Sequence, residues 1–245
     1  MILVSGASTA AGRELVRLLI HQGEPVPAFL CDPAELEAKF AGRCEVMGGD
    51  FSEPAGLRAA LGGVRLFYLT SFDHPETVTW QSNALEAAKA AGVERLVRLS
   101  APAADPNSTV NFARWHGVFE QRAGACGIPY AHLRPNWYMD NFLEEYLANG
   151  VLRLAAGRAS TSLIDARDIA AAAARTLLEP GHGGRVYGLT GPAAITHAAA
   201  ADALPARPAS RSATKTPIWA GPYARPSSRP RRPGASRWML AWASG

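Results

Sequence analysis

The sequence predicts an α/β fold: a doubly wound parallel sheet of strand order 3-2-1-4-5-6, covered by helices on both faces. Two observations carry this prediction. Short apolar runs with strand character alternate with amphipathic helical segments. The first such run, Met1 to Val4, leads through a turn of small residues into a helix expected from about Arg13. A chain of 245 residues suits one such domain, which we expect to span residues 1–204.

The remaining strands and helices are predicted from the periodicity of apolar residues and from proline, glycine and helix-capping residues at their ends. Further strands are expected at Val26–Leu30, Cys44–Met47, Val64–Leu69, Arg95–Leu99 and Tyr130–Leu133, with a late strand at Arg185–Leu189. Pro27 marks the start of the second strand, because proline is poorly tolerated inside a sheet. Helices are expected at residues 54–61, 77–91, 112–125 and 168–178, with a short last helix from Thr196. Asp32 reads as one helix start, and Asp168 as the cap of the alanine-rich helix.

The C-terminal 41 residues, 205–245, differ in composition from the rest. They hold seven prolines and no Asp or Glu, and they show no helical or strand period. A basic, irregular and disordered tail is one interpretation. A segment read out of frame is the other, and the two alternative reading frames of the gene would decide between them.

Charge and cysteine usage limit the function classes. All 21 acidic residues lie in residues 1–202, which carry a net charge of −4, so the chain's net +4 comes from its tail. Nothing in the main domain therefore predicts nucleic-acid binding. No run is long enough to span a membrane, and the three cysteines have no metal-like spacing, so we expect a cytoplasmic protein with reduced thiols and no metal.

The turn after the first strand predicts a dinucleotide site of the Rossmann type. Gly6 permits a sharp exit from the strand, and Gly12 lets the helix lie close to the sheet. Backbone N–H groups at such a helix start favour a pyrophosphate. Thr9 stands where a third glycine is usual, so its Cβ holds the backbone further from the phosphates, although its hydroxyl offers a hydrogen bond. The expected contacts in the turn are Gly6, Ser8, Thr9, Ala10, Ala11 and Gly12. A strand–helix turn without a ligand is the alternative.

Residues that follow the next strands should border the same ligand. Asp32 lies 20 residues after Gly12, which is the spacing of a ribose-binding acid, although a helix cap is an equally good interpretation. Thr70, Ser71 and Phe72 follow the fourth strand, and ligands of such folds bind beyond the carboxyl ends of the strands.

Several motifs together resemble the NmrA-like family of atypical short-chain dehydrogenases/reductases. Besides the glycine turn, these motifs are Gly49-Asp50-Phe51, the helix with His116 and Glu120, Gly127-Ile128-Pro129-Tyr130, Leu133-Arg134-Pro135, Asn141-Phe142, Ile164 to Ala170 and Leu189-Thr190-Gly191-Pro192. The pattern is most similar to type 2 NAD(P)H quinone oxidoreductases, and the resemblance covers about residues 1–204. Family members usually continue with helices that wall the substrate cleft, and the tail of this chain departs from that pattern.

The resemblance implies a nicotinamide cofactor. Asp50 and Phe51 match the family's adenine contact, the alternative being a loop-capping Asp and a core Phe. Members that favour NADP often carry an Arg where this chain has Cys31, and another where it has Pro27. These differences and Asp32 favour NAD over NADP, while Arg13 at the helix start offers a phosphate partner that would restore NADP binding.

The catalytic end departs from the wider superfamily, whose members use a Ser, a Tyr and a Lys four residues after the Tyr. Ser100 matches the Ser region, but Phe112 and His116 stand where the Tyr and Lys would be. His116 suits cofactor ribose binding or proton exchange, with a packing histidine as the alternative. Tyr138 is the second candidate catalytic residue. Asn136, Trp137, Tyr138 and Phe142 follow the sixth strand and are expected to line a pocket for a flat ring, unless they belong to the core.

The sequence therefore predicts NAD(P)H-dependent reduction of a small quinone-like or carbonyl acceptor without a Tyr/Lys pair. A non-catalytic dinucleotide-binding redox sensor that acts through a protein partner is the alternative. Sugar-nucleotide epimerisation ranks third, because it needs the missing Tyr and Lys.

Overall fold

The computed structural model describes residues 1–30, 40, 42–142 and 157–203. They form two compact units. One comprises Met1–Asp140 and Thr161–Ala194, and the other the described parts of Asn141–Ser160 and Ile195–Gly245. Cys31 and Asp32, and the helix start predicted there, lie outside the described residues.

The first unit is built on a seven-stranded sheet of order β3-β2-β1-β4-β5-β6-β8, in which all neighbouring strands are parallel. Its strands are β1 (Ile2–Ser5), β2 (Ala28–Leu30), β3 (Val46–Gly48), β4 (Leu66–Leu69), β5 (Arg95–Leu99), β6 (Tyr130–Pro135) and β8 (Arg185–Leu189). This confirms the predicted order and adds the predicted late strand at the edge beside β6. The chain changes direction of winding between β3 and β4, so β1 and β4 border a switch point, where ligands of doubly wound sheets bind.

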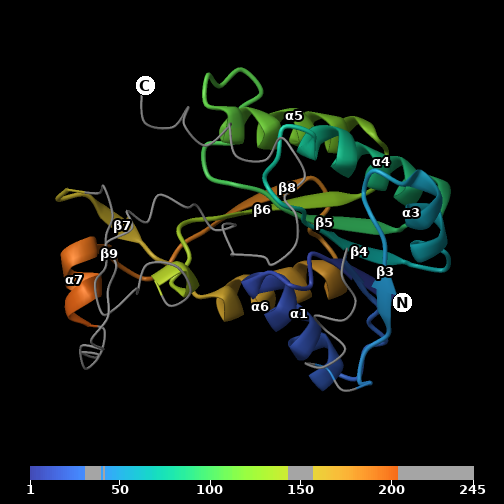
Figure 1. The fold of residues 1–245 in the computed structure, drawn as a ribbon, viewed down its shortest axis with the longest axis horizontal. Helices are drawn as coiled ribbons and strands as arrows, with labels where there is room; N and C mark the ends of the chain where they lie inside the picture. The colour runs from blue at the N-terminus through green and yellow to red at the C-terminus, as the bar shows by residue number, and fades with distance from the viewer. Residues whose placement is uncertain (31–39, 41, 143–156, 204–245) are drawn as a thin grey trace, which may run out of the picture. The chain divides into compact units, whose positions relative to one another are not determined.

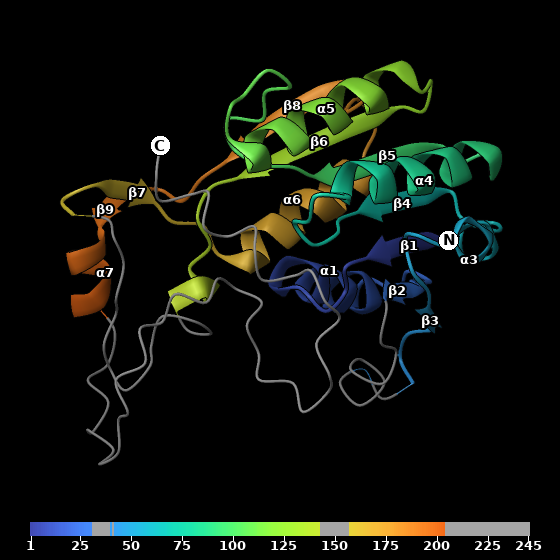
Figure 2. The same ribbon diagram turned by 45° about the horizontal axis from the view of Figure 1, so that its top comes forward.

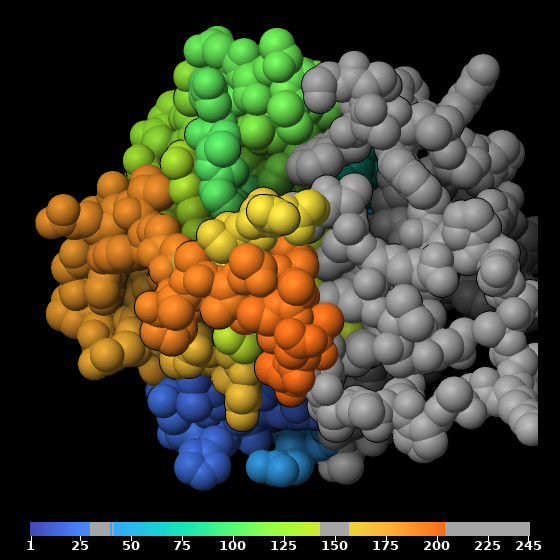
Figure 3. Space-filling model, turned by 90° about the vertical axis from the view of Figure 1, so that its left-hand side faces the viewer, coloured from blue at the N-terminus to red at the C-terminus, as the bar shows by residue number. Residues whose placement is uncertain are grey.

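Helices cover both faces of this sheet (Figure 1 and Figure 2). α3 (Pro54–Ala60), α4 (Thr77–Ala90) and α5 (Asn111–Ala125) lie on one face, and α1 (Ala10–His21) and α6 (Ala166–Leu178) on the other. In the space-filling view of Figure 3, the segment around α5, in green, lies on one side of this unit, and the first residues of the chain, in blue, lie on the opposite side.

Each face has its own hydrophobic core because successive strand residues point to opposite sides. Leu3, Phe67 and Leu96 pack toward α3, α4 and α5, with Phe119 of α5 among their neighbours. Val4, Tyr68, Val97 and Leu133 pack toward α1 and α6. By the same alternation, Arg98 of β5 and His132 of β6, which are register partners, face the α4 and α5 layer.

Two helix starts differ from the prediction. α1 begins at Ala10 rather than near Arg13, because Thr9 is its N-cap. α6 begins at Ala166, and the prediction that Asp168 caps it is wrong: Asp165 has the extended backbone of a cap, and its Oδ1 accepts a hydrogen bond from the Arg167 N–H at 2.8 Å. Asp168 lies in the first turn, where its negative charge still suits the helix dipole.

Two short strands that the sequence did not predict, β7 (Ser160–Ser162) and β9 (Ala194–Thr196), pair in a separate two-stranded sheet. In the second unit α7 (His197–Asp202) begins after Thr196, as predicted, and the Thr196 Oγ1 accepts from the Ala199 N–H. None of the described helices is both long and apolar enough to cross a membrane.

Candidate functional site

The turn between β1 and α1 is as tight as the glycine pattern predicts. Gly6 has φ of 62°, in the left-handed region, and a Cβ there would lie 2.3 Å from the Thr70 Cγ2. A Cβ on Gly12 would lie 2.3 Å from the carbonyl oxygen of Gly6. Both positions therefore exclude a side chain, and they bring the start of α1 against the ends of β1 and β4.

Thr9 forms hydrogen bonds within the turn through both its side chain and its backbone. Its Oγ1 donates to the Gly6 carbonyl at 2.8 Å and accepts from the Gly12 N–H at 3.1 Å, while its own N–H also donates to the Gly6 carbonyl. Both of its donors are therefore committed, so the phosphate hydrogen bond suggested for its hydroxyl would have to replace this cap.

The first turn of α1 fits the phosphates of a dinucleotide. Among the described residues, the N–H groups of Ala10 and Ala11 have no hydrogen-bond partner, and the first turn holds no acidic residue. Unpaired amides at a helix start favour an anion. Ser8 precedes them, and its carbonyl accepts from the Arg13 guanidinium at 3.4 Å.

The end of β4 is fixed against this turn by Ser5. The Ser5 Oγ accepts from the Thr70 N–H at 2.9 Å and lies 3.0 Å from the Thr70 carbonyl. Thr70 is buried, Ser71 is half-buried and Phe72 is exposed. The three residues predicted to follow β4 therefore lead outward from the glycine turn.

Asp50 and Phe51 adopt the alternative roles considered from the sequence. The Asp50 Oδ1 accepts from the Ser52 N–H at 2.7 Å, which caps the loop. The Phe51 ring is only 8% exposed and meets the Phe29 ring edge-on, with centroids 5.5 Å apart. An adenine contact by these two residues stays a prediction.

A group of hydrogen-bonded polar residues, Arg98, Gln81 and Ser71, lies near the end of β4, between the sheet and α4. The buried Arg98 donates from Nε to the Gln81 Oε1 at 2.7 Å, and the Gln81 Nε2 donates to the Ser71 Oγ, also at 2.7 Å. The Arg98 guanidinium carbon stands 4.6 Å from the centre of the Phe119 ring. Burial lowers the pKa of Arg98 to about 9, which still leaves it charged at neutral pH.

Ser100, at the end of β5, belongs to an ion-pair cluster. Glu120 of α5 accepts from the Ser100 Oγ at 2.5 Å and takes two hydrogen bonds from Arg134, from Nε at 3.0 Å and from Nη2 at 2.5 Å. Burial raises the pKa of Glu120, but the bonds from Arg134 and Ser100 outweigh it, so the net pKa is lowered. Ser100 therefore gives its one hydroxyl hydrogen to Glu120 rather than to a ligand.

His116 projects from α5 beside this cluster. It is 7% exposed, its ring meets Phe112 edge-on at 4.7 Å, and its Nε2 lies 3.5 Å from the Asp73 Oδ1. Burial lowers its pKa, Asp73 opposes that effect, and Arg98 adds to it. The neutral imidazole therefore holds its hydrogen on Nε2 toward Asp73, because an N–H on the enclosed Nδ1 would be unpaired.

The four residues predicted to line a substrate pocket divide between the two units. Asn136, Trp137 and Tyr138 follow β6, and the Asn136 Oδ1 accepts from the Trp137 N–H at 2.9 Å. Trp137 is 37% exposed. Tyr138 packs beside Ile164 and Ile169 at the start of α6, so the two predicted catalytic residues, Tyr138 and His116, come from opposite helical layers. Phe142 is buried in the second unit against His197, with ring centres 5.9 Å apart.

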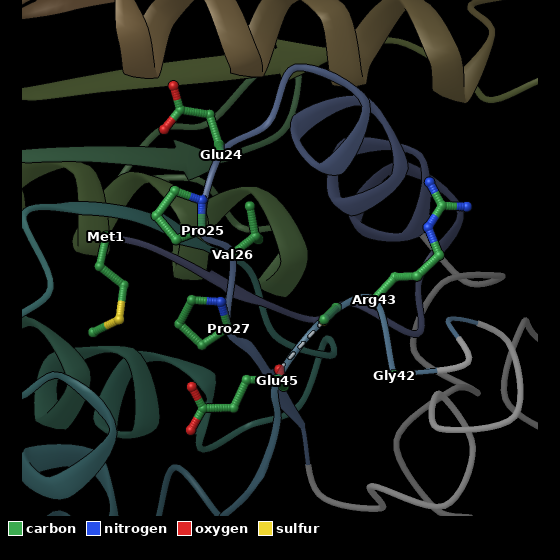
Figure 4. A pocket seen from close by; sticks show the side chains of 9 residues that line it. Met1, Glu24, Pro25, Val26, Pro27, Gly42, Arg43 and Glu45 are labelled. Atoms are coloured by element: carbon green, nitrogen blue, oxygen red, sulfur yellow. Dashed lines mark hydrogen bonds between the residues drawn. The ribbon is translucent and has the colours of Figure 1, made fainter.

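One hollow in the described part lies away from these residues. It is bordered by residues that precede β1, β2 and β3, among them Pro25, Pro27, Arg43 and Cys44 (Figure 4). These residues stand at the amino ends of the strands, opposite the predicted cofactor edge. Burial raises the pKa of the Cys44 thiol, which argues against a reactive thiolate there. The described residues contain no cluster of His, Cys, Asp and Glu suited to a metal.

The sequence prediction missed Arg98, Gln81, Asp73 and His132. The signal for Arg98 was present, since an arginine within the apolar run of β5 has to be paired when it is buried. Gln81 carries no such signal, because glutamine on an amphipathic helix usually faces water.

Comparison with known proteins decides the family. Residues 6–180 match the family model described as NAD(P)H-binding. The chain belongs to this NAD(P)H-binding family. It is 36% identical over 209 residues to the NAD(P)H azoreductase of Xenophilus azovorans, covering 84% of this chain and 73% of that protein. It is 34% identical over 202 residues to quinone oxidoreductase 2 of Escherichia coli (strain K12), covering 80% and 70%.

Solved structures agree with this assignment. The NADPH-dependent quinone oxidoreductase of Escherichia coli, complexed with NADPH, superposes with a TM-score of 0.71 at 33% identity, covering 80% of this chain and 71% of that one. The triphenylmethane reductase of Citrobacter sp., complexed with NADP(H), gives a TM-score of 0.70 at 27% identity, with 80% and 71% covered. The resemblance expected from the sequence motifs is thereby confirmed.

Proposed function

We propose that this protein is an NAD(P)H-dependent oxidoreductase that reduces a small quinone-like or carbonyl acceptor. The observation that carries the proposal is the first turn of α1, where the Ala10 and Ala11 N–H groups have no partner among the described residues, at the switch point between β1 and β4. Family membership supports a nicotinamide dinucleotide there, and relatives named as quinone and azo reductases support the acceptor class.

The chain's own residues suit reduction without a tyrosine donor. A bound reduced nicotinamide supplies a hydride, so a quinone needs one further proton, which water can deliver to a hydroquinone oxygen. Neutral His116 can offer its Nε2 hydrogen to an acceptor or ribose oxygen once that oxygen replaces the Asp73 carboxylate. Phe112 has no proton to give, and the Ser100 hydroxyl hydrogen goes to Glu120. His116 is thus the proposed polar group at the reacting end, and Tyr138 the proposed wall of the acceptor pocket.

Turnover assays test this proposal. NADH and NADPH oxidation should be followed spectroscopically with a panel of quinones. His116→Ala should lower kcat/KM about tenfold, the value of one lost hydrogen bond in the transition state, while His116→Gln should retain part of the activity through its amide N–H. Tyr138→Ala, which removes the ring that forms the proposed wall, should mainly raise KM. Equal activity in all these variants would contradict the assigned roles.

The choice between NADH and NADPH depends on the region of Cys31 and Asp32, outside the described residues. The solved relatives described above bind NADPH or NADP(H), which gives no support to the NAD preference expected from the sequence. We propose the dinucleotide as cofactor, with titration against both forms to rank them.

A redox sensor is the second candidate, and the observation that favours it is the phenylalanine at the position of the missing tyrosine. Phe112 packs edge-on against His116, so this part of the site is partly sealed by an apolar ring. Tight cofactor binding with no turnover of any quinone would favour the sensor, which needs a protein partner.

A further inference from the structure

Arg98 is the largest fully buried side chain in the described part of the chain, and only one of its nitrogen atoms bonds to protein there. Its Nε donates to the Gln81 Oε1 at 2.7 Å, whereas Nη1 and Nη2 have no hydrogen-bond partner among the described residues. A buried cation normally pairs with a carboxylate. Here the Arg98 Nε donates to the neutral side-chain amide of Gln81, and the same amide donates to Ser71 near the edge of the sheet.

Arg98 determines the donor and acceptor roles in the series of hydrogen bonds that runs from Arg98 through Gln81 to Ser71. A guanidinium can only donate, so the amide atom that faces it must be the oxygen of Gln81. The Gln81 Nε2 then faces the Ser71 Oγ and donates to it. Ser71 is therefore an acceptor on its inner side, and its own hydrogen has to point elsewhere.

Within the described chain that hydrogen has only a weak partner. The Phe72 carbonyl lies 3.4 Å from the Ser71 Oγ, beyond the usual range for a hydroxyl donor. Ser71 is half-buried and follows Thr70, whose methyl group packs on Gly6 at the dinucleotide turn. A donor with no good partner is thus held beside the predicted cofactor edge.

We propose that Arg98 and Gln81 are positioning residues that fix Ser71 as a hydrogen-bond donor to an oxygen atom of the bound nicotinamide dinucleotide. The inference rests on the proposed function for the place of the cofactor. A permanent positive charge behind the amide strengthens each donor in the series, since hydrogen-bonded groups polarise one another in a low-dielectric interior. The arrangement selects an acceptor oxygen over an N–H group at this point of the ligand.

The test is a double-mutant cycle on cofactor affinity, measured as the Kd for NADPH and NADH by fluorescence or calorimetry. Ser71→Ala removes the donor and should raise Kd about 3- to 10-fold. Gln81→Glu should also raise Kd. Its carboxylate pairs with Arg98 but can only accept hydrogen bonds, so it cannot donate to Ser71. It therefore takes the Ser71 hydrogen that the ligand would otherwise receive. Gln121→Glu, an exposed position on α5, controls for the added negative charge.

The combined variant separates positioning from general damage. Once Ser71 is alanine, Gln81→Glu should change Kd no further. Gln81→His should preserve affinity, because one ring nitrogen can accept from Arg98 while the other donates to Ser71. A full effect of Gln81→Glu in the Ser71→Ala background, or wild-type affinity of Gln81→Glu, would overturn the inference while leaving the proposed function intact. Absence of dinucleotide binding by the unaltered chain overturns both.

Discussion

Two bidentate ion pairs of similar geometry differ in burial and should therefore differ in their contribution to stability. Glu120 receives two hydrogen bonds from Arg134, and the side chains are 12% and 29% exposed. Glu94 receives two from Arg65, at 2.7 and 2.8 Å, but these side chains are 52% and 68% exposed. Replacing each glutamate by alanine removes the same chemical group from both settings.

The expected loss differs because water can replace only the exposed partner. Glu120→Ala leaves the Arg134 guanidinium and the Ser100 hydroxyl without their acceptor in a largely enclosed site. Breaking a buried pair by removing one partner costs about 3–5 kcal/mol, and the remaining access of Arg134 to water reduces this to about 2–4 kcal/mol. Glu94→Ala should leave the free energy of unfolding unchanged within error, since exposed pairs contribute little.

Urea unfolding at neutral pH, followed by circular dichroism, measures both effects as shifts of the midpoint at constant m-value. The difference between wild type and Glu120→Ala should shrink in acid, because a carboxylate whose folded pKa is lowered loses its contribution as pH falls through that pKa. Equal midpoint shifts for the two variants would refute the reasoning from burial.

Two further predictions concern the turn and the buried histidine. Gly6→Ala should destabilise the protein by about 1–2 kcal/mol more than Gly23→Ala in urea unfolding, because both have positive φ but only the first Cβ meets a neighbour, Thr70; equal losses would contradict this. Burial, with Arg98 and Arg134 adding to it, lowers the pKa of His132 to about 4. The unfolded chain then binds up to one more proton than the folded chain between about pH 4 and 6.5, so stability should decrease as the pH is lowered through that window. His132→Leu should flatten this slope by up to about 1.4 kcal/mol per pH unit, and an unchanged slope would show that His132 does not titrate in this way.

The fold could be predicted because its signals are local. The strand, small-residue turn and helix at residues 1–21 are continuous in sequence, and apolar periodicity places most other elements to within two residues. The prediction of the residue that caps α6 was wrong for a physical reason. Asp165 and Asp168 both precede an alanine run, and only the backbone conformation decides which of them is the cap. β7 and β9 are three residues each, too short for a periodic signal.

The site could be predicted only in part. Its cofactor turn is local, but the polar layer behind it joins Ser71, Gln81 and Arg98 from a loop, a helix and a strand. These three residues come together only because of the way α4 packs on the sheet, and residue spacing in the sequence does not predict that packing. The same packing turned Phe51 inward to the core and directed the Ser100 hydroxyl to Glu120.

We propose that the first turn of α1 binds a nicotinamide dinucleotide that is used for reduction. The most direct measurement is a titration of the full chain with NADPH and with NADH, followed by the addition of a quinone to the saturated protein. We predict saturable binding of at least one dinucleotide and its oxidation upon quinone addition. Absence of binding to either form would contradict the account at its first step, and binding without oxidation would contradict its reductase function.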